Sequence, residues 1–134
     1  MAQRIHTHIT NLSNEHSSWL RGVAFYNDEL CILKHRLAEV SFENTAQEVK
    51  AEVEHYQNQF IIQENNLREL KKDIDKNFEL IGKDLEEKAM HVGNSTMAET
   101  DSLRTRYIHL EKIVNELRHA FNRFFCDHME TAVH

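Results

Sequence analysis

The sequence contains no proline and only three glycines among its 134 residues. Because proline and glycine end helices and shape the turns between strands, their scarcity argues against a chain of many short segments and favours a few long helices. No stretch approaches the ~20 apolar residues that span a bilayer, and the N-terminus lacks the apolar core of a signal peptide. We therefore expect a cytoplasmic protein with no membrane partner.

Cysteine is also sparse, and acidic residues outnumber basic ones. Cys31 and Cys126 show neither C-x-x-C nor zinc-type spacing, which predicts reduced thiols rather than a disulfide framework. The formal net charge is −6, so no positive field attracts nucleic acid, and we expect no nucleic-acid partner. Neither a G-x-S-x-G motif nor a glycine-rich phosphate loop is present. The expectation is a protein that is not an enzyme.

The sequence does contain three stripes of large apolar residues spaced alternately three and four positions apart. They run from Trp19 to Val40, from Val49 to Leu85 and from Leu103 to Phe124. This spacing gives each helix one apolar seam. We expect an all-α fold, with one coiled-coil-like helical-bundle domain over 1–134 and a loose N-terminal tail at 1–12. Its three long antiparallel helices are expected at about 14–42, 46–92 and 97–130.

Capping residues suggest where these helices end. Ser13 is the expected N-cap of the first helix. Asn44 and Gly93 are expected in the left-handed conformation that terminates the first two helices, and the capping boxes that begin at Thr45 and Thr96 are expected to start the next two.

The second stripe predicts a change of phase in its last third. Two successive steps of four indicate a stutter that turns Asn77 and Asp84 outward and places Phe78, Ile81 and Leu85 in the seam. With the expected bounds, the first helix covers the second only to about residue 73, so these three residues need another cover. We expect a second copy of the chain to provide it, making a homodimer. The alternative is a break near Gly82 that folds the rest back as a short extra helix.

Further apolar residues lie off the seams, namely Phe25 and Ile32 in the first helix and Ile61 and Ile62 in the second. They are either scattered exposed residues, which are common, or a second apolar stripe that receives a partner helix. The candidate oligomer interface therefore comprises seven residues: Phe25, Ile32, Ile61, Ile62, Phe78, Ile81 and Leu85.

A metal site is the alternative function that the sequence raises. Glu52-x-x-His55 and Glu116-x-x-His119 repeat the spacing that ferritin-like bundles use for two iron, manganese or zinc ions. In the heptads, only Glu52 lies beside a seam, and the expected register separates the two motifs by about 33 Å along the axis. We therefore expect no cofactor, although an antiparallel dimer would bring the two motifs closer.

Three polar residues fall on the seams. His16 and His128 lie near helix ends and are expected at the edge of the core with one ring nitrogen in water; the alternative is a ligand or a pH-sensitive contact. Gln63 either fixes the register of the bundle or lies at a widened, hydrated point.

Two runs, HSSWLRGVAFYNDELCILKHRLAEV and EVKAEVEHYQNQF, carry a family resemblance. With their His-x-x-Trp-Leu, Phe-Tyr-x-Asp-Glu and Glu-His elements, they resemble a group of small helical proteins of Bacteroidetes-type bacteria for which no activity is known. The resemblance covers the first helix and half of the second, implies a bacterial cytoplasmic setting and supplies no catalytic residue. We expect a non-enzymatic helical bundle that self-associates and binds a protein partner.

Overall fold

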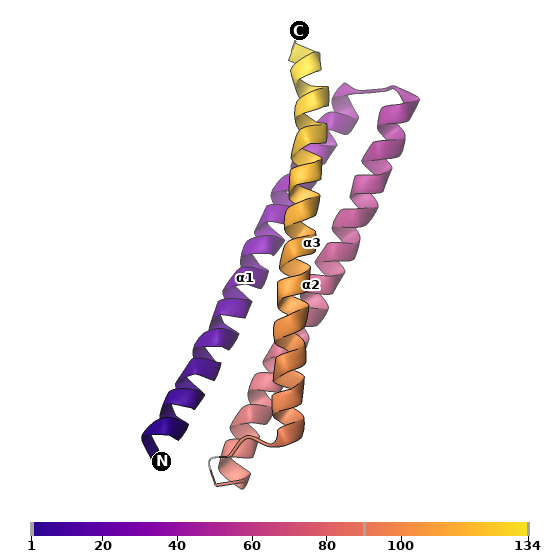
Figure 1. Cartoon of the computed structure of the whole chain (residues 1–134). Helices are drawn as coiled ribbons and strands as arrows, with labels where there is room; N and C mark the ends of the chain where they lie inside the picture. Colours follow the sequence, from indigo (N-terminus) through magenta and orange to yellow (C-terminus); the bar gives the residue numbers. More distant parts are fainter. Residues whose placement is uncertain (1, 90, 134) are drawn as a thin grey trace. The chain divides into compact units, whose positions relative to one another are not determined.

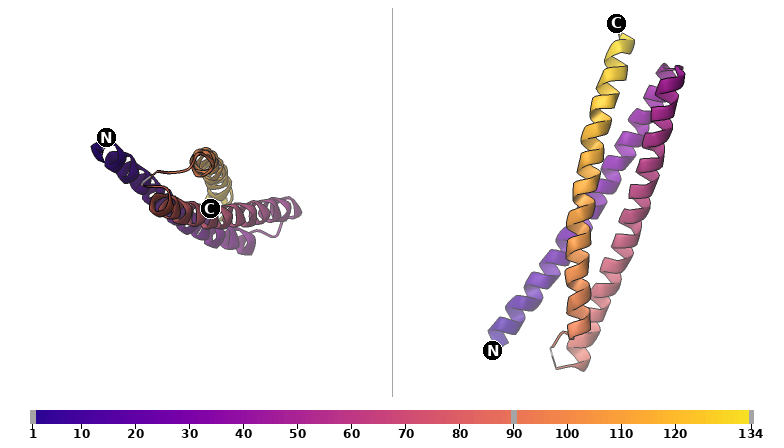
Figure 2. Two further views of the ribbon diagram at one scale, coloured as in Figure 1. Left: turned by 90° about the horizontal axis from the view of Figure 1, so that it is seen from below. Right: turned by 45° about the vertical axis from the view of Figure 1, so that its right-hand side comes forward.

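A computed structural model describes residues 2–89 and 91–133, with side chains described for 8–89 and 91–129. Within these ranges the chain forms three α-helices and no strand: α1 (Ala2–Glu43), α2 (Gln47–Glu87) and α3 (Asn94–Val133) (Figure 1). Figure 2 shows the same helices from two further directions. The expected all-α bundle of three helices is confirmed. No helix, over the residues described, has an apolar stretch long enough to cross a membrane.

The helices contribute to two compact units. Unit 1 comprises Met1–Ala24 and Arg68–His109, and unit 2 comprises Phe25–Leu67 and Leu110–His134. Each unit therefore contains a segment of all three helices. A single domain over 1–134 remains a prediction.

Unit 2 is held by aliphatic and aromatic seams. Leu30, Leu33 and Phe60 are almost fully buried. The Tyr56 ring on α2 packs against Phe121 and Phe124 of α3, with ring centroids 5.3 and 5.0 Å apart. Such aromatic pairs contribute about 0.5–1.5 kcal/mol each beyond the area they bury.

In unit 1, an aromatic side chain of α3 packs against a glycine of α1. Trp19 and Val23 of α1 are buried in its core, and the Trp19 and Tyr107 rings are 6.5 Å apart. The Tyr107 side chain of α3 occupies the space that a Cβ at Gly22 would fill. The absence of a side chain at Gly22 therefore allows α1 and α3 to approach closely at this point.

Residues 2–12 are helical, so the expected loose tail is wrong for that range. Leu12 is 5% exposed because it continues the apolar seam of α1 by one more turn beyond His16. Ser13 consequently lies inside the helix rather than at its N-cap. Met1 lies outside the described residues.

The expected left-handed terminators are also wrong. Among the described residues, only Ala89 has a positive φ, at 51°. The backbone N–H and the side-chain amide of Asn44 both donate to the Val40 carbonyl, each at 3.0 Å, which closes α1 without a left-handed residue. α2 ends at Glu87, and the Gly93 N–H donates to Asp84 at 3.0 Å.

The predicted stutter does not occur. Asn77 is fully buried and Asp84 is 8% exposed, whereas Phe78 is 51% exposed. The seam keeps its spacing because both polar side chains find hydrogen-bonding partners inside unit 1, which offsets the cost of burying them. α2 is continuous through Gly82, so the alternative short extra helix is also wrong.

The end of α2 that was expected to lack a cover lies beside α1. Ile9 and Leu12 of α1 line a groove together with Phe78, Ile81 and Leu85 of α2. Ile81 is buried and Leu85 is half-buried. Ile9 and Leu12, in the added helical turns, provide this cover, so burial of the α2 seam does not itself require a second copy.

Substitution by alanine at the two helical glycines, Gly22 and Gly82, is expected to have opposite effects on stability. Gly22→Ala places a methyl group in the space of Tyr107 and is expected to lower the free energy of unfolding by about 1–3 kcal/mol through overpacking. Gly82→Ala meets nothing within 4 Å and is expected to raise it by about 0.5–1 kcal/mol through helix propensity. Urea denaturation measures both, and equal effects of the two variants would contradict the packing at Gly22.

Candidate functional site

The candidate metal ligands do not form a site. Glu52, His55, Glu116 and His119 are all exposed. In the residues that the structure describes, no group of three or more His, Cys, Asp or Glu side chains is arranged to hold a metal ion.

The observed register of α2 and α3 differs from the expected one. Tyr56 lies beside Phe121 and Phe124, which places Glu116 about 16 Å from Glu52 along the axis rather than about 33 Å. The difference arises because α2 ends and α3 begins earlier than expected. The two motifs are closer than predicted, but their side chains face solvent.

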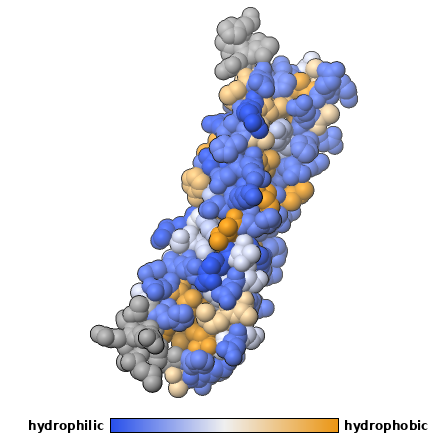
Figure 3. All heavy atoms as spheres, viewed as in Figure 1, coloured by the Kyte–Doolittle hydropathy of each residue, from blue (hydrophilic) through white to orange (hydrophobic). Residues whose placement is uncertain are grey.

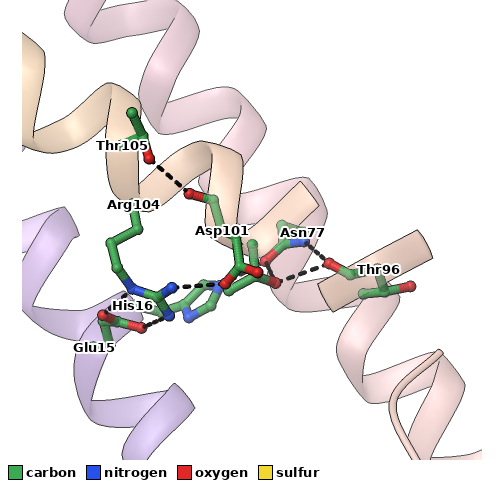
Figure 4. A network of polar contacts seen from close by, with 8 residues as sticks. Glu15, His16, Asn77, Thr96, Asp101, Arg104 and Thr105 are labelled. Atoms are coloured by element: carbon green, nitrogen blue, oxygen red, sulfur yellow. Dashed lines mark hydrogen bonds and ion pairs between the residues drawn. The ribbon is translucent and has the colours of Figure 1, made fainter. Parts of the chain in front are cut away.

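A buried polar network in unit 1 joins all three helices (Figure 4). His16 of α1 is 2% exposed, and its Nε2 lies 2.8 Å from Oδ1 of Asn77 on α2. The Thr100 hydroxyl of α3 donates to the same Oδ1 at 2.9 Å, and the Asn77 amide donates to the Thr96 carbonyl at 3.4 Å. Sequence reasoning placed His16 on the seam but missed these partners, because they are distant in the sequence.

Both ring nitrogens of His16 have partners inside the protein. Nδ1 lies 2.8 Å from the Leu12 carbonyl oxygen, so the expectation that one nitrogen faces water is wrong. A neutral imidazole has only one N–H, so donation to both oxygens requires the charged ring. A neutral ring therefore donates to only one of these two oxygens, and its tautomer decides which.

Asp84 connects the end of α2 to the beginning of α3. The Thr96 hydroxyl donates to its Oδ2 at 2.7 Å and the Gly93 N–H donates at 3.0 Å, while Lys88 lies 3.5 Å from the other oxygen. The Thr96 hydroxyl, followed by the Gly93 N–H, holds the pKa of Asp84 below its ordinary value. Thr96 therefore binds a carboxylate of the neighbouring helix, rather than acting as the N-cap of its own helix.

An ion pair borders this network. Arg104 Nε and Nη2 donate to the two carboxylate oxygens of Glu15, each at 2.7 Å, and Nη1 donates to Asp101 at 2.7 Å (Figure 4). Hydrogen bonding by Arg104 lowers the pKa of Glu15, and the two carboxylates raise the pKa of Arg104. Because these side chains are about one-third exposed, the pair adds little stability despite its two-pronged geometry.

Unit 2 has a smaller polar cluster between α1 and α3. The Tyr26 hydroxyl donates to Glu111 at 3.0 Å and accepts from the Asn115 amide at 3.2 Å. Burial raises the pKa of Tyr26. Arg118 pairs with Glu29 at 3.3 Å, and its guanidinium lies 5.8 Å from the centre of the half-exposed Phe25 ring. These contacts join the two helices.

The other two polar seam residues differ in burial. Gln63 is 5% exposed and accepts from Asn66 at 3.4 Å, so it is a seam residue as expected. His128 is half-buried, with its ring 4.6 Å from that of Phe124.

Large apolar side chains reach the surface of both units. Figure 3 shows apolar residues between hydrophilic ones on the face it presents. Of the seven interface candidates, five are about half exposed: Phe25, Ile32, Ile61, Ile62 and Phe78. The sequence analysis missed Phe42, which is 85% exposed, and Ile108, which is 59% exposed. Both residues lie in expected helices but off the apolar seams, and this position is the feature of the sequence that could have identified them as exposed.

Unit 1 also has an apolar groove between α1 and α2. Its volume is about 160 Å³, and its walls are Ile9, Leu12, Ser13, Phe78, Ile81, Gly82 and Leu85. Among these, only Ser13 has a polar side chain, so the groove is suited to an apolar group.

The His16–Asn77 hydrogen bond predicts a non-additive pair of substitutions. Asn77→Leu leaves His16 Nε2 buried without a partner and is expected to lower the free energy of unfolding by about 1–3 kcal/mol. The double variant His16→Leu/Asn77→Leu removes both polar partners and is expected to lose less than the sum of the single changes. A denaturant-based double-mutant cycle measures this, and additive losses would contradict the hydrogen bond.

The lowered pKa of Asp84 predicts a pH-dependent contribution to stability. The folded state favours the carboxylate, so the stabilisation is present above the ordinary pKa of 3.8 and is lost as the pH falls through the lower folded value. Wild type is expected to unfold at a higher temperature than Asp84→Asn at neutral pH, with the gap narrowing below about pH 4. Thermal melts across this range measure the gap, with Asp75→Asn as the exposed control. A gap independent of pH would contradict the role of the ionised carboxylate.

Comparison with protein-family models, with curated proteins and with solved structures finds no match for this chain. The resemblance of α1 and the first half of α2 to helical proteins of Bacteroidetes-type bacteria therefore remains an expectation. Function has to be inferred from the surfaces and the polar contacts described above.

Proposed function

We propose that this protein is a non-enzymatic helical bundle that self-associates as a homodimer and binds a protein partner. The observation that carries the proposal is the set of half-exposed large apolar side chains on both units. Phe25 and Ile32 lie seven residues apart on one face of α1, and Ile61 and Ile62 lie on α2. Exposed apolar groups of this size, gathered on helix faces, are typical of interaction surfaces.

The polar contacts support binding rather than catalysis. Most groups with shifted pKa values have partners that hold the helices together: Glu15 with Arg104, Asp84 with Thr96, and Tyr26 with Glu111. Burial raises the pKa of the remaining group, Tyr56, whose ring packs between α2 and α3. None of these groups lines the apolar groove of unit 1. Active sites instead direct perturbed groups toward a cavity that receives the substrate.

Charge and resemblance define the proposed setting. A net charge of −6 is unfavourable for a nucleic-acid partner and compatible with a protein partner. The resemblance to helical proteins of Bacteroidetes-type bacteria supports a bacterial cytoplasmic location. No cofactor is needed for this role.

Self-association is tested by measuring mass in solution. Wild-type chain at micromolar concentration is expected to give twice the chain mass by size-exclusion chromatography with light scattering, and dilution is expected to reach a monomer. Sedimentation equilibrium provides the dissociation constant. A monomer throughout the micromolar range would overturn the homodimer part of the proposal.

A further inference from the structure

One stretch of α2 has an outer face that is almost free of charge. Between His55 and Leu67 the sequence contains a single charged residue, Glu64, which pairs with Lys34 of α1 at 3.1 Å. The helix is rich in charge on either side of this stretch. The exposed side chains within it are amides and isoleucines: Gln57, Asn58, Ile61, Ile62, Asn65 and Asn66. Asn58, Ile61, Ile62 and Asn65 share one side of the helix because they are three or four residues apart, and we call this side the neutral face.

Helix stability does not account for the composition of the neutral face. Asparagine and isoleucine form helices less readily than alanine, lysine and glutamate, which are the favoured residues at exposed helical positions. The consecutive residues Ile61 and Ile62 are each 46% exposed. Apolar groups bordered by polar ones are typical of a surface that becomes buried on association.

The charges along the Ile61 side of the neutral face reverse sign about its centre. Glu54 lies seven residues before Ile61, and Arg68 lies seven residues after it. Seven residues make two turns, so the three side chains follow one line along the continuous helix α2. If Ile61 meets its equivalent in an antiparallel copy, Glu54 of each copy faces Arg68 of the other. Two ion pairs then form by symmetry.

The rest of the neutral face has the same property. His55 and Glu69 lie seven residues before and after Ile62, so an imidazole of one copy faces a carboxylate of the other. Asn58 of each copy faces Asn65 of the other in the same arrangement, and an amide both donates and accepts hydrogen bonds. Antiparallel pairing therefore gives every polar group at the centre a compatible neighbour.

The outer turns of α2 preserve this match. The next facing pairs are Gln47 with Asp75, Glu48 with Lys76 and Ala51 with Lys72. No two like charges face each other along these lines. A parallel pairing would instead place each charge against its own equivalent in the other copy, which is unfavourable.

We propose that two copies of this chain associate through the neutral face, with their α2 helices antiparallel about a two-fold axis between Ile61 and Ile62. Identical chains of net charge −6 repel one another unless their contact surface is neutral or complementary, and this face is both. The reversal of charge about one point is what two-fold symmetry requires of a single surface, whereas a different partner protein does not require it. The inference rests on the proposed self-association and identifies its surface.

A charge reversal tests the occupant and its direction together. Glu54→Arg and Arg68→Glu each replace two ion pairs by two repulsive pairs, and each is expected to raise the dimer dissociation constant at least about tenfold in sedimentation equilibrium. An equimolar mixture of the two variants is expected to form a heterodimer as tight as the wild-type dimer, because both pairs are restored. Parallel pairing predicts that each single variant dimerises as tightly as wild type.

Two controls separate this effect from overall charge and from folding. Glu99→Arg changes the net charge as Glu54→Arg does, but at an exposed position of α3, and it is expected to leave the dimer intact. Circular dichroism is expected to show unchanged helical content in every variant. At the centre of the face, Ile61→Glu places two carboxylates at the axis and is expected to dissociate the dimer. Phe42→Glu is its matched control because Phe42 is 85% exposed and lies on α1.

Cross-linking tests the register. In a background of Cys31→Ser and Cys126→Ser, the full chain with Ile61→Cys is expected to form a disulfide-linked dimer under mild oxidation. Asp75→Cys lies on the same line of α2, but antiparallel pairing separates the two copies of residue 75 by about 40 Å. This variant is therefore expected to stay uncross-linked, and efficient cross-linking at residue 75 would overturn the antiparallel register.

The outcomes distinguish this surface from the broader proposal. A dimer that persists in Glu54→Arg, Arg68→Glu and Ile61→Glu, yet dissociates in Phe25→Ser or Ile32→Ser, would overturn this surface and keep self-association. A wild-type chain that stays monomeric would overturn both, including when another protein occupies the neutral face. Variants that each dissociate but do not combine as a heterodimer would overturn the pairing of Glu54 with Arg68.

Discussion

The hydrogen bond between His16 and Asn77 is the interaction on which the arrangement of unit 1 depends. An asparagine at a seam position is unfavourable unless its amide is satisfied, and here the ring of α1 and the hydroxyl of α3 satisfy its oxygen. This pairing allows α2 to keep one uninterrupted seam through Asn77 and Asp84. It also turns Phe78 to the surface, where the side chain becomes available for contact. A buried polar group thus determines which apolar group is exposed.

The sequence predicts the seams well and their polar exceptions poorly. The apolar residues from Trp19 to Val40 are buried at the expected spacing. The prediction failed at Asn77, because hydrophobicity alone ranks Phe78 above asparagine for a core position. The partners that reverse this ranking lie 61 and 23 residues away in the sequence, at His16 and Thr100. Local periodicity contains no information about such distant hydrogen bonds.

The candidate surfaces were predicted only in part, for a related reason. Phe25, Ile32, Ile61 and Ile62 are exposed because they lie off the seams, which the heptads reveal. The groove of unit 1 was not foreseen, since it requires α1 to include Ile9 and Leu12, which were assigned to a loose tail. The predicted register of α2 and α3 was wrong because an error of a few residues at a helix end shifts the predicted alignment of every residue in one helix with its neighbour in the other. Spacing within one helix is therefore more predictable than the alignment of two.

The turn between α2 and α3 is stabilised by contacts between the helices rather than by the preference of its own residues. Its left-handed position is occupied by Ala89, although left-handed backbone is strained for a residue with a Cβ. Gly93, which would tolerate that conformation, instead contributes an N–H to Asp84. Local preference therefore does not form this turn; the carboxylate of one helix and the donors at the start of the next hold it. Contacts between the two helices therefore stabilise this reversal of the chain against the backbone strain at Ala89.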